Sequence, residues 1–459
     1  MSNVIHKNDP TLGDNLIQDY IDIFSTYSFK NELYGRLSLH VLLGQAISKS
    51  VYFTIGARRI DPRIHLLLIK PQGSGKGAGF GFVERMAREL GLDFQSLTEA
   101  TDAGLVGTLD RDENGDTIVV PGLLRTADIV GMEEASVLFD YTSEFSKKNM
   151  TYMQITMNPL EDSSCFIRKR LGPETIEFAP HASFLLMTYP PDRLVDKLLK
   201  TGFVDRVIAL FEDVTLEDRI WVIRKMTENI NKLSKKEANK KFDGVKNRLK
   251  AIIRLYTETN ANSEIKIPKD VQSLLVGTIE EFAMKILDAS PKAREKLEHF
   301  VNRLYEILIK LAIHHAILDM RDTLDVSDVI YARLTYLPVW NNLIISIESL
   351  LIISDVERFR RNRIIRQSIE EYDRILQEES APHVKKGVWV RRLTMVDNLR
   401  LKWDHCTKET ADNNLRKIEK SNQISLEGFG KIPELEQDKF FEKTRFGNFD
   451  YVKKIKDIK

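Results

Sequence analysis

The sequence predicts an α/β core with a parallel sheet, followed by an all-α region and a C-terminal winged helix-turn-helix. Between His65 and about Thr215, four β-like apolar runs, "IHLLLI", "DTIVV", "HASFLLMTY" and "RVIALFEDV", alternate with helical segments, which is typical of a parallel sheet. From Leu216 to about Ile353, amphipathic helices replace the strand signals. After Pro382, two short helices precede a strand and a glycine turn, the order of a winged helix-turn-helix.

The same patterns divide the chain into five segments. From Asn15 to about Ser50 apolar residues recur at helical spacing, which predicts two or three helices before the first strand. The stretch "ERFRRNRIIRQSIEEYDRILQEESAPH" predicts a solvated helix that ends near Pro382. We therefore expect an N-terminal helical segment at 1–55, the α/β core at 56–215, a helical lid domain at 216–355, a linker helix at 356–382, and a winged-helix domain with its tail at 383–459.

The composition of the chain narrows the range of its partners. In 459 residues, 68 basic and 67 acidic side chains nearly cancel, so any nucleic-acid surface has to be local. Cys165 and Cys406 lie far apart and belong to no CxxC pair, which argues against a disulfide framework. The N-terminus is polar, and no apolar stretch reaches the roughly 18 residues that a membrane helix needs. We expect a cytoplasmic protein with no membrane partner.

The stretch "HLLLIKPQGSGKGAGFGFVERM", residues 65–86, runs from an apolar strand through a glycine-rich turn into a helix. A phosphate loop (P-loop) needs small residues whose backbone N–H groups wrap a phosphate, a lysine that reaches the outer phosphates, and a helix N-terminus that faces the anion. Gly73, Gly75 and Lys76 meet these needs. With Ser74 and Gly77 they form the predicted nucleotide-binding set.

Two positions depart from the usual P-loop. Lys70 stands where the first glycine is expected, and Gly77, followed by Ala78, replaces the Ser or Thr that binds Mg²⁺. Gly77 does not exclude a phosphate site, because nucleoside monophosphate kinases also carry Gly-Lys-Gly, although a threonine follows there. The alternative is a structural turn that only resembles a P-loop.

Two downstream motifs resemble a known family of ATPases. "TDAGLVGTL" (101–109) and "PGLLRTADIVGMEEASVLF" (121–139) follow the loop in the order found in the minichromosome-maintenance type of AAA+ ATPase. The run after the acidic pair is also similar to the ATPase modules of phage and plasmid primase-helicases. The resemblance spans roughly residues 66–214 and implies an AAA+ P-loop ATPase that uses ATP and Mg²⁺.

The resemblance places an acidic pair at Glu133 and Glu134, directly after the strand-like "DIVGM". Hydrolysis of a phosphoanhydride needs one carboxylate to hold hydrated Mg²⁺ and another to orient and polarise the attacking water. Glu133 is the candidate metal ligand and Glu134 the candidate catalytic residue. Two alternatives stay open: the pair is Asp140 and Glu144 in "VLFDYTSEF", or the acids are solvated residues at a helix start.

The same resemblance implies roles for three further side chains. Thr188 ends the strand "ASFLLMT" where these ATPases keep a polar sensor, and Arg206 lies in the segment that supplies an arginine finger to the neighbouring subunit. Arg303 is the candidate sensor arginine of the lid, with Arg294 an equal candidate. An arginine that acts on a neighbour requires a second subunit, so the resemblance implies a homo-oligomer, a hexameric ring. The alternative for Arg206 is a surface pair with Asp205.

Two regions are expected to contact DNA. "SCFIRKRLGPETIEFAP" predicts a hairpin that projects into the ring channel of the resembled helicases, where Arg168, Lys169 and Arg170 would contact phosphates. The alternative is an ordinary surface hairpin with a charged tip. From Lys385 to Lys420 the chain has ten Lys/Arg against five Asp/Glu, an excess that suits a DNA-binding helix-turn-helix, although winged helices also dock proteins. The candidates there are Lys408, Asn413, Asn414, Arg416 and Lys417.

These motifs favour an ATP-dependent DNA-processing motor, and among such motors a ring-forming DNA helicase of replication in a virus, a plasmid or another mobile element. A non-helicase DNA-binding ATPase, such as a replication initiator or loader, is the first alternative. A nucleotide-binding scaffold without turnover is the second, because Gly77 and Glu133 differ from the residues usual at those positions.

Overall fold

The computed structural model describes most of the chain up to residue 349 and short pieces beyond it. The described residues are 12–28, 31–97, 101–111, 117–136, 144–160, 165–171, 174–189, 202–229, 235–259, 262–349, 374, 384–385, 389–391, 441–446 and 449–454. The chain forms two compact units, which are described separately. The first comprises 1–191 with 197–348, and the second comprises 192–196 with 349–459.

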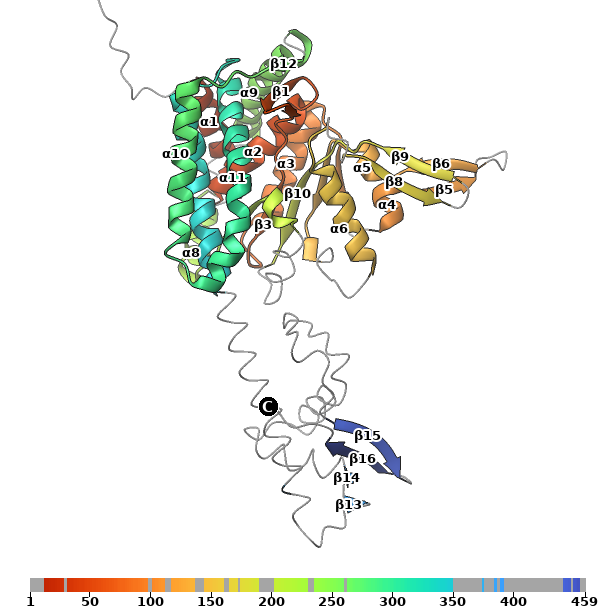
Figure 1. Ribbon diagram of the computed structural model, residues 1–459. Helices are drawn as coiled ribbons and strands as arrows, with labels where there is room; N and C mark the ends of the chain where they lie inside the picture. Colours follow the sequence, from red (N-terminus) through yellow and green to blue (C-terminus); the bar gives the residue numbers. More distant parts are fainter. Residues whose placement is uncertain are drawn as a thin grey trace, which may run out of the picture. The chain divides into compact units, whose positions relative to one another are not determined.

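A five-stranded parallel sheet lies within the first unit (Figure 1). Four of its strands are buried along their whole length, as expected where both faces of a parallel sheet are covered. Because all strands run the same way, their carboxyl ends meet at one edge. In spatial order the strands are β11 (Ile208–Phe211), β3 (Leu66–Ile69), β10 (Ser183–Thr188), β7 (Ile129–Met132) and β4 (Phe94–Leu97).

The predicted α/β core with a parallel sheet is confirmed, with two corrections to its strands. The sequence pattern places "DTIVV" among the sheet strands, but this run forms β6 (Thr117–Pro121), which pairs antiparallel with β5 (Gly107–Arg111) outside the sheet. Ile118 and Val119 are 42% and 38% exposed, so the run lines a hairpin surface. The sheet instead contains β4, whose "FQSL" has the mixed burial of an edge strand and gives a weak apolar signal.

The N-terminal helices pack directly on the core. The pattern predicts two or three helices, and the described residues of this segment form two, α1 (Leu12–Tyr27) and α2 (Glu32–Ile47). Both contact α3 (Lys76–Leu90), and α2 also contacts β3 and β10. Phe24 of α1 and Tyr34 of α2 pack edge to face with ring centroids 5.1 Å apart. These helices therefore belong to the same compact unit as the sheet.

The region after the sheet is helical, as predicted, apart from one short strand. α9 packs on α1 and α3, and α11 packs on α1 and α2, so the boundaries predicted at 55 and 215 lie inside one compact unit. In Figure 1 this helical layer lies across the sheet from the hairpins. None of the described helices combines the length and the apolar character needed to cross a membrane. The helices are α8 (Leu216–Asn229), α9 (Lys235–Arg254), α10 (Lys269–Ile286), α11 (Pro291–Leu318) and a helix over 326–349.

A small second sheet joins the two halves of the first unit. β1 (Val51–Ile55) pairs antiparallel with β2 (Arg58–Ile60). Its other edge pairs parallel with β12 (Ser263–Glu264), the short strand within the helical region. This pairing links the segment that enters the core to the segment between α9 and α10.

Two β-hairpins extend side by side from the sheet region (Figure 1). One is β5–β6, and the other pairs β8 (Ile167–Leu171) with β9 (Glu174–Phe178), which confirms the hairpin predicted for this stretch. Its turn at 172–173 lies outside the described residues. Beside the hairpins, α4 contacts α5, α6 and β5. These helices are α4 (Asp102–Val106), α5 (Leu123–Thr126) and α6 (Glu144–Thr156).

The second unit contains a four-stranded antiparallel sheet among its described residues. Its order is β13 (Val384–Lys385), β14 (Trp389–Arg391), β16 (Phe449–Lys454), β15 (Phe441–Phe446). The predicted helices of the winged helix-turn-helix lie outside the described residues, so this module stays a prediction. The same holds for its candidate DNA contacts, Lys408, Asn413, Asn414, Arg416 and Lys417.

Candidate functional site

Residues 70–75, the glycine loop, connect the carboxyl end of β3 to α3. Gly73 and Gly75 have φ angles of 71° and 78°, the left-handed backbone that glycine adopts without strain. Lys76 is the first residue of α3, so the N-terminus of a 15-residue helix adjoins the loop. The free N–H groups and the dipole at such a terminus favour an anion. The strand, loop and helix predicted for 65–86 are therefore present with a suitable backbone.

The turn between α1 and α2 holds the glycine loop from the side. Ser28 Oγ donates a hydrogen bond to the Gly75 carbonyl at 2.8 Å, and Asn31 Nδ2 donates to the Ser74 carbonyl at 3.0 Å. Ser28 and Asn31 are 47 and 43 positions away from these partners. Sequence reasoning missed both residues, because their role depends on how the helices pack.

Lys70, which stands where a P-loop usually has its first glycine, fixes the glycine loop through its side chain. Its side chain is 4% exposed, donates to Asn31 Oδ1 and forms a 2.7 Å ion pair with Glu212, the residue after β11. Lys70 therefore links the glycine loop to the α1–α2 turn and to the end of β11, where the usual glycine would make no side-chain contact.

The side-chain ammonium of Lys76 is buried next to the glycine loop. The residue is 8% exposed, and its Nζ donates to the carbonyls of Lys70 and Thr188 at 3.0 and 3.1 Å. Nζ also lies 3.4 Å from the centroid of the Tyr189 ring. Burial lowers the pKa of Lys76 to about 8, against the opposing effect of the nearby acidic pair. The hydrogen-bond partners of the Lys76 ammonium are neutral groups, so a charged phosphate oxygen would bind it more strongly.

Thr188 contributes its backbone to this arrangement. Its carbonyl accepts from the Lys76 ammonium and from the Lys70 N–H, while its buried hydroxyl donates to the Tyr189 carbonyl at 3.4 Å. The predicted sensor therefore lies beside Lys76 at the end of β10, as expected from the motif order.

Glu133 and Glu134 directly follow β7, and both lie close enough to Lys76 to raise its pKa. A Cβ on Gly77 would lie 3.9 and 4.0 Å from the two Glu133 carboxylate oxygens, which is ordinary van der Waals contact. Glu133 therefore adjoins the position where a P-loop Ser or Thr hydroxyl is usually found. Glu134 accepts a hydrogen bond from the Ser136 hydroxyl.

The described residues do not test the alternative acidic pair, Asp140 and Glu144. Asp140 lies outside the described residues, and Glu144 begins α6 with a side chain that is not described. Among the residues that the structure places, no three His, Cys, Asp or Glu side chains gather to hold a metal ion. Mg²⁺ commonly keeps several waters and takes one or two carboxylates plus substrate phosphates, and Glu133 fits that pattern.

Glycines in the family-like motifs allow close packing around the acidic pair. A Cβ on Gly131, inside β7, would come within 2.6 Å of the rings of Phe80 and Phe94. A Cβ on Gly122 would lie 2.4 Å from the backbone of Leu105, so α4 and the lead-in to β7 touch there. The unusual glycine in "DIVGM" is thus explained by the aromatic rings of α3 and β4 that cover it.

A cavity of about 560 Å³ opens beside the glycine loop, within the size range of small-molecule sites. Its walls come from the loop, the segment after β11, α8 and the helix over 326–349. Ser74 lines it, and the Ser74 Oγ atom is buried with no hydrogen-bond partner among the described residues. A buried hydroxyl without a partner is costly, so this atom favours a polar ligand.

Arg219 of α8 brings a second cation to the glycine loop. Its Nη1 atom lies 2.8 Å from the position that a Cβ on Gly73 would take. Thr215 and Asp218 cap the start of α8 reciprocally: the Thr215 hydroxyl and N–H donate to the Asp218 carboxylate, and the Asp218 N–H donates to Thr215 Oγ. The cap fixes the turn that carries Arg219. Sequence reasoning missed Arg219, although the Thr-x-x-Asp cap was readable at 215–218.

The three basic residues of β8 have different surroundings. Lys169 is 12% exposed, donates to a β5 backbone carbonyl and pairs with Asp102 at 3.0 Å, so it ties the two hairpins together. Arg168 is 71% exposed and pairs across the hairpin with Glu177 at 2.9 Å. Arg170 follows two residues later, on the same strand face as Arg168. A DNA contact, if made by this strand, therefore involves Arg168 and Arg170 more readily than Lys169.

Arg206 and Arg303 lie together at the opposite end of β3. Arg206 ends a short 3₁₀ turn immediately before β11, and it lines a cavity of about 30 Å³ with Arg303 and His65, the residue before β3. The glycine loop follows the other end of β3. The structure therefore does not bring Arg303 to the glycine loop of its own chain, where the lid-sensor hypothesis requires it.

The amino-end cluster consists of charged residues that partner one another. Arg63, 1% exposed, pairs with Asp61 at 2.7 Å, and its guanidinium also donates to three backbone carbonyls, those of residues 156, 158 and 182. Lys310 pairs with Glu306 at 2.8 Å. Burial raises the pKa of Asp61, but the charge and hydrogen bonds of Arg63 outweigh it and hold this pKa well below its usual range. The cluster comprises Asp61, Arg63, Asp205, Arg206, Arg303, Glu306 and Lys310.

Arg206, the predicted arginine finger, is half-buried. Its side chain is 26% exposed, donates to the Gly202 carbonyl and lies 3.6 Å from Asp205. Burial lowers the pKa of Arg206, which Asp205 opposes and Arg303 reinforces. Both readings of Arg206, a finger for a neighbouring subunit and a pair with Asp205, agree with this placement.

Comparisons with known proteins do not assign the chain to a family. No protein-family model matches the chain, and no curated protein matches its sequence. The function therefore has to be argued from the residues gathered at the glycine loop.

Proposed function

We propose that the chain is an ATPase that binds ATP with Mg²⁺ at the glycine loop and uses hydrolysis to process DNA. One observation carries the proposal: Lys76, Glu133 and Glu134 lie around the carboxyl ends of β3, β10 and β7, next to the glycine loop, whose residues Lys70, Gly73 and Ser74 line the 560 Å³ cavity. Ligands of open α/β sheets bind outside the carboxyl ends of the strands. The motif resemblance extends the proposal to a ring-forming DNA helicase of replication in a virus, a plasmid or another mobile element.

The residues of the cavity fit a nucleotide. The glycine loop and the N-terminus of α3 supply backbone N–H groups for phosphate. Lys76 supplies one cation at the carbonyls of Lys70 and Thr188, Arg219 supplies another near Gly73, and Ser74 supplies a hydroxyl with no hydrogen-bond partner among the described residues. The remaining volume, between α8 and the segment after β11, accommodates the nucleoside.

In the proposed mechanism, Glu134 and Glu133 have different roles in hydrolysis. Glu134 orients an attacking water and takes its proton, a contribution of about 10² to 10⁴ to the rate. Glu133 holds the hydrated metal next to Gly77. Mg²⁺, when bound, neutralises charge on the phosphate oxygens. Lys76 leaves the carbonyls of Lys70 and Thr188 to meet the outer phosphates.

The position of Arg206 supports the proposal of a ring. Since this arginine lies at the amino end of β11, it does not reach the glycine loop of its own chain. A subunit that presents this end to a neighbour's loop would supply the arginine there, and the site of each subunit would be completed by the next.

Gly77 favours one second candidate, a nucleotide-binding scaffold without turnover. The loop lacks the hydroxyl that usually binds Mg²⁺, although a serine side chain has room beside Glu133. In a hydrolysing enzyme that already holds the metal through Glu133 and water, Gly77→Ser raises Mg²⁺-dependent turnover or leaves it nearly unchanged. In a scaffold the wild type binds ATP and shows no turnover with any nucleic acid.

The deciding experiment is ATP hydrolysis by the purified full chain with and without single-stranded DNA. We expect hydrolysis that single-stranded DNA accelerates, together with displacement of an annealed strand. Acceleration without strand displacement would point to an initiator or loader. Binding without hydrolysis, with Glu134→Gln indistinguishable from the wild type, would overturn the motor and leave the scaffold.

A further inference from the structure

Helix α9 concentrates positive charge in a chain that is otherwise nearly neutral. Its 20 residues, "KKEANKKFDGVKNRLKAIIR", contain eight Lys/Arg and two Asp/Glu, and no role at the glycine loop uses them. The buried face of the helix is apolar, with Phe242, Val245, Leu249 and Ile252. The cations therefore occupy the other faces, where they meet solvent.

Four of these cations form a stripe on the face opposite the buried one. Lys236, Lys240, Lys250 and Arg254 follow one another at helical spacing, with Asn247 between them. The stripe runs roughly 27 Å, at about 1.5 Å for each residue. No hydrogen bond or ion pair engages these four side chains among the described residues.

The acidic residues near the stripe are already paired. Asp243 pairs with Lys246 at 2.7 Å, and Glu89 of α3 pairs with the same lysine at 3.4 Å. Glu84 pairs with Arg88 at 2.7 Å. These pairs leave the charge of the stripe uncompensated.

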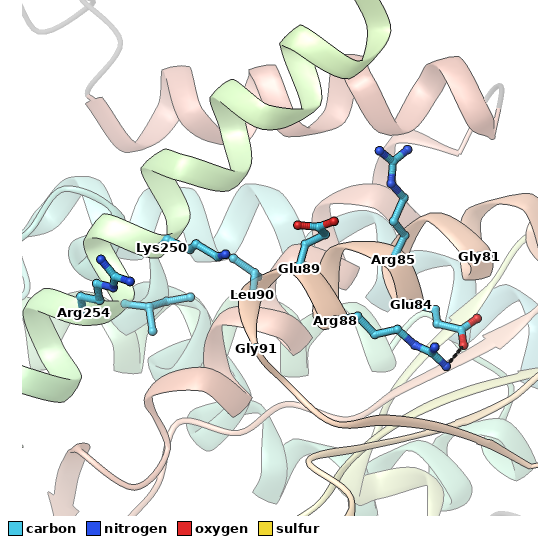
Figure 2. Close-up of a pocket in the computed structure, with 10 residues that line it drawn as sticks. Gly81, Glu84, Arg85, Arg88, Glu89, Leu90, Gly91, Lys250 and Arg254 are labelled. Carbon is cyan, nitrogen blue, oxygen red and sulfur yellow. Dashed lines mark hydrogen bonds and ion pairs between the residues drawn. The ribbon is translucent and has the colours of Figure 1, made fainter. Parts of the chain in front are cut away.

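The stripe borders a groove between α9 and the C-terminal half of α3. The groove has a volume of about 870 Å³ and is lined by Lys250 and Arg254 of α9, and Figure 2 shows the Lys250 side chain extending toward Leu90 at the end of α3. Arg85 and Arg88 of α3 line the same groove. Apolar side chains are few there, which does not suit the hydrophobic centre of a protein–protein interface.

We propose that the α9 stripe, with the groove beside it, binds the sugar-phosphate backbone of duplex DNA without reading its sequence. Duplex DNA carries one negative charge per about 1.7 Å of its axis, and cations that neutralise it release counterions. A row of cations on one helix, without ion-pair partners among the described residues and with only Leu90 and Ile253 as apolar side chains in the groove beside it, matches such a ligand. The proposal depends on the proposed function only for the choice of DNA, and it does not require nucleotide at the glycine loop.

The test is the salt dependence of duplex binding by the nucleotide-free full chain. A variant with alanine at Lys236, Lys240, Lys250 and Arg254 is compared with one that has alanine at Lys266, Lys269, Lys285 and Lys292, which removes the same charge elsewhere. Fluorescence anisotropy of a labelled duplex is followed from about 50 to 200 mM salt. In the stripe variant we expect the slope of log K against log salt to become shallower by roughly 3 to 4, about 0.9 for each lost contact. The control variant should keep the wild-type slope.

Other outcomes separate this surface from the ATP site and from protein docking. Equal slopes in both variants, or no duplex binding by the wild type, would overturn the proposal. Tighter binding of a poly-glutamate chain than of a duplex with equal charge would also overturn it and indicate an acidic protein partner. Lys76→Ala should bind the duplex as the wild type does, so a failed ATP site leaves this result unaffected. Thermal unfolding confirms that each variant is folded.

Discussion

The two ends of β3 both carry dense charge, but they differ in how that charge is partnered. At the amino end, Arg63 pairs with the buried carboxylate of Asp61, and Lys310 pairs with the half-buried carboxylate of Glu306. At the carboxyl end, Lys76 donates only to backbone carbonyls, and the Ser74 hydroxyl has no hydrogen-bond partner among the described residues. Burial lowers the pKa of Lys76 to about 8, while the pKa of Asp61 is held low by its partner Arg63.

The difference separates a structural cluster from a binding site. Buried charges that neutralise one another, as Arg63 and Asp61 do, stabilise one arrangement, whereas Arg206 of the same cluster is 26% exposed and is the residue proposed to act on a neighbouring subunit. At the carboxyl end, the Lys76 ammonium has no carboxylate partner and the Ser74 hydroxyl has no hydrogen-bond partner among the described residues. An anion would stabilise both groups. Substitutions at the two ends of β3 should therefore have different effects, on ATP binding and turnover at the carboxyl end and on stability at the amino end.

The largest expected effect is on turnover. Glu134→Gln should lower the rate of ATP hydrolysis by about 10² to 10⁴, because the amide still hydrogen-bonds water but cannot take its proton. ATP affinity should stay within a factor of about two or three. Steady-state hydrolysis and equilibrium binding measure the two quantities. Glu281→Gln, which breaks an ion pair with Arg333 between two helices after the sheet, is the control, and a similar loss of turnover there would contradict the assignment.

The next effect is on stability and belongs to the amino end. Arg63→Met should lower the free energy of unfolding by about 3 to 5 kcal/mol, because it leaves the Asp61 carboxylate buried without its partner. Urea denaturation at neutral pH measures this change. The folded fraction should bind ATP with wild-type affinity. A loss of ATP affinity in folded Arg63→Met protein would show that the two ends are not separate.

A smaller effect is expected at Arg219. Arg219→Ala should weaken ATP binding by roughly 10- to 150-fold, the equivalent of one charge-assisted hydrogen bond of about 1.5 to 3 kcal/mol. Arg224→Ala, an exposed arginine on the same helix, is the matched control and should bind as the wild type does. If both variants bind equally well, Arg219 makes no contact with the nucleotide.

The smallest effect is a pH dependence of ATP affinity. The pKa of Lys76 is lowered to about 8 in the free protein, and a bound phosphate raises it, so binding takes up a proton above that pH. Affinity should be constant below about pH 7 and fall by roughly fivefold between pH 8 and 9, as the charged fraction drops from about a half to a tenth. Lys76→Arg, which does not titrate in this range, should remove that fall. A pH-independent wild type would contradict the lowered pKa.

Local signals in the sequence were sufficient for the elements that carry the site. The apolar run of β3, the glycines at 73 and 75 and the amphipathic α3 are all encoded within residues 65–86, so the strand, loop and helix were predicted correctly. The β8–β9 hairpin was predicted for the same reason. The position of β6 was wrong, because an apolar run alone does not show whether a strand lies in a sheet or in an exposed hairpin.

Residues that act through long-range packing could not be predicted. Ser28 and Asn31 reach the glycine loop only because α1 and α2 pack on α3, and Arg219 reaches it from a helix that follows the last sheet strand. The lid arginine shows the converse. Its helix was predicted, but the 28-residue α11 has to be docked on the core before Arg303 can be assigned to either end of β3.

The central claim is that nucleotide binds at the carboxyl end of β3, and two buried lysines test it most directly. Lys76 and Lys310 are each 8% exposed and lie at opposite ends of that strand. Equilibrium titration of ATP with Mg²⁺ should give no measurable binding for folded Lys76→Ala and wild-type affinity for folded Lys310→Ala. Wild-type affinity in Lys76→Ala, or loss of binding in Lys310→Ala alone, would contradict the claim.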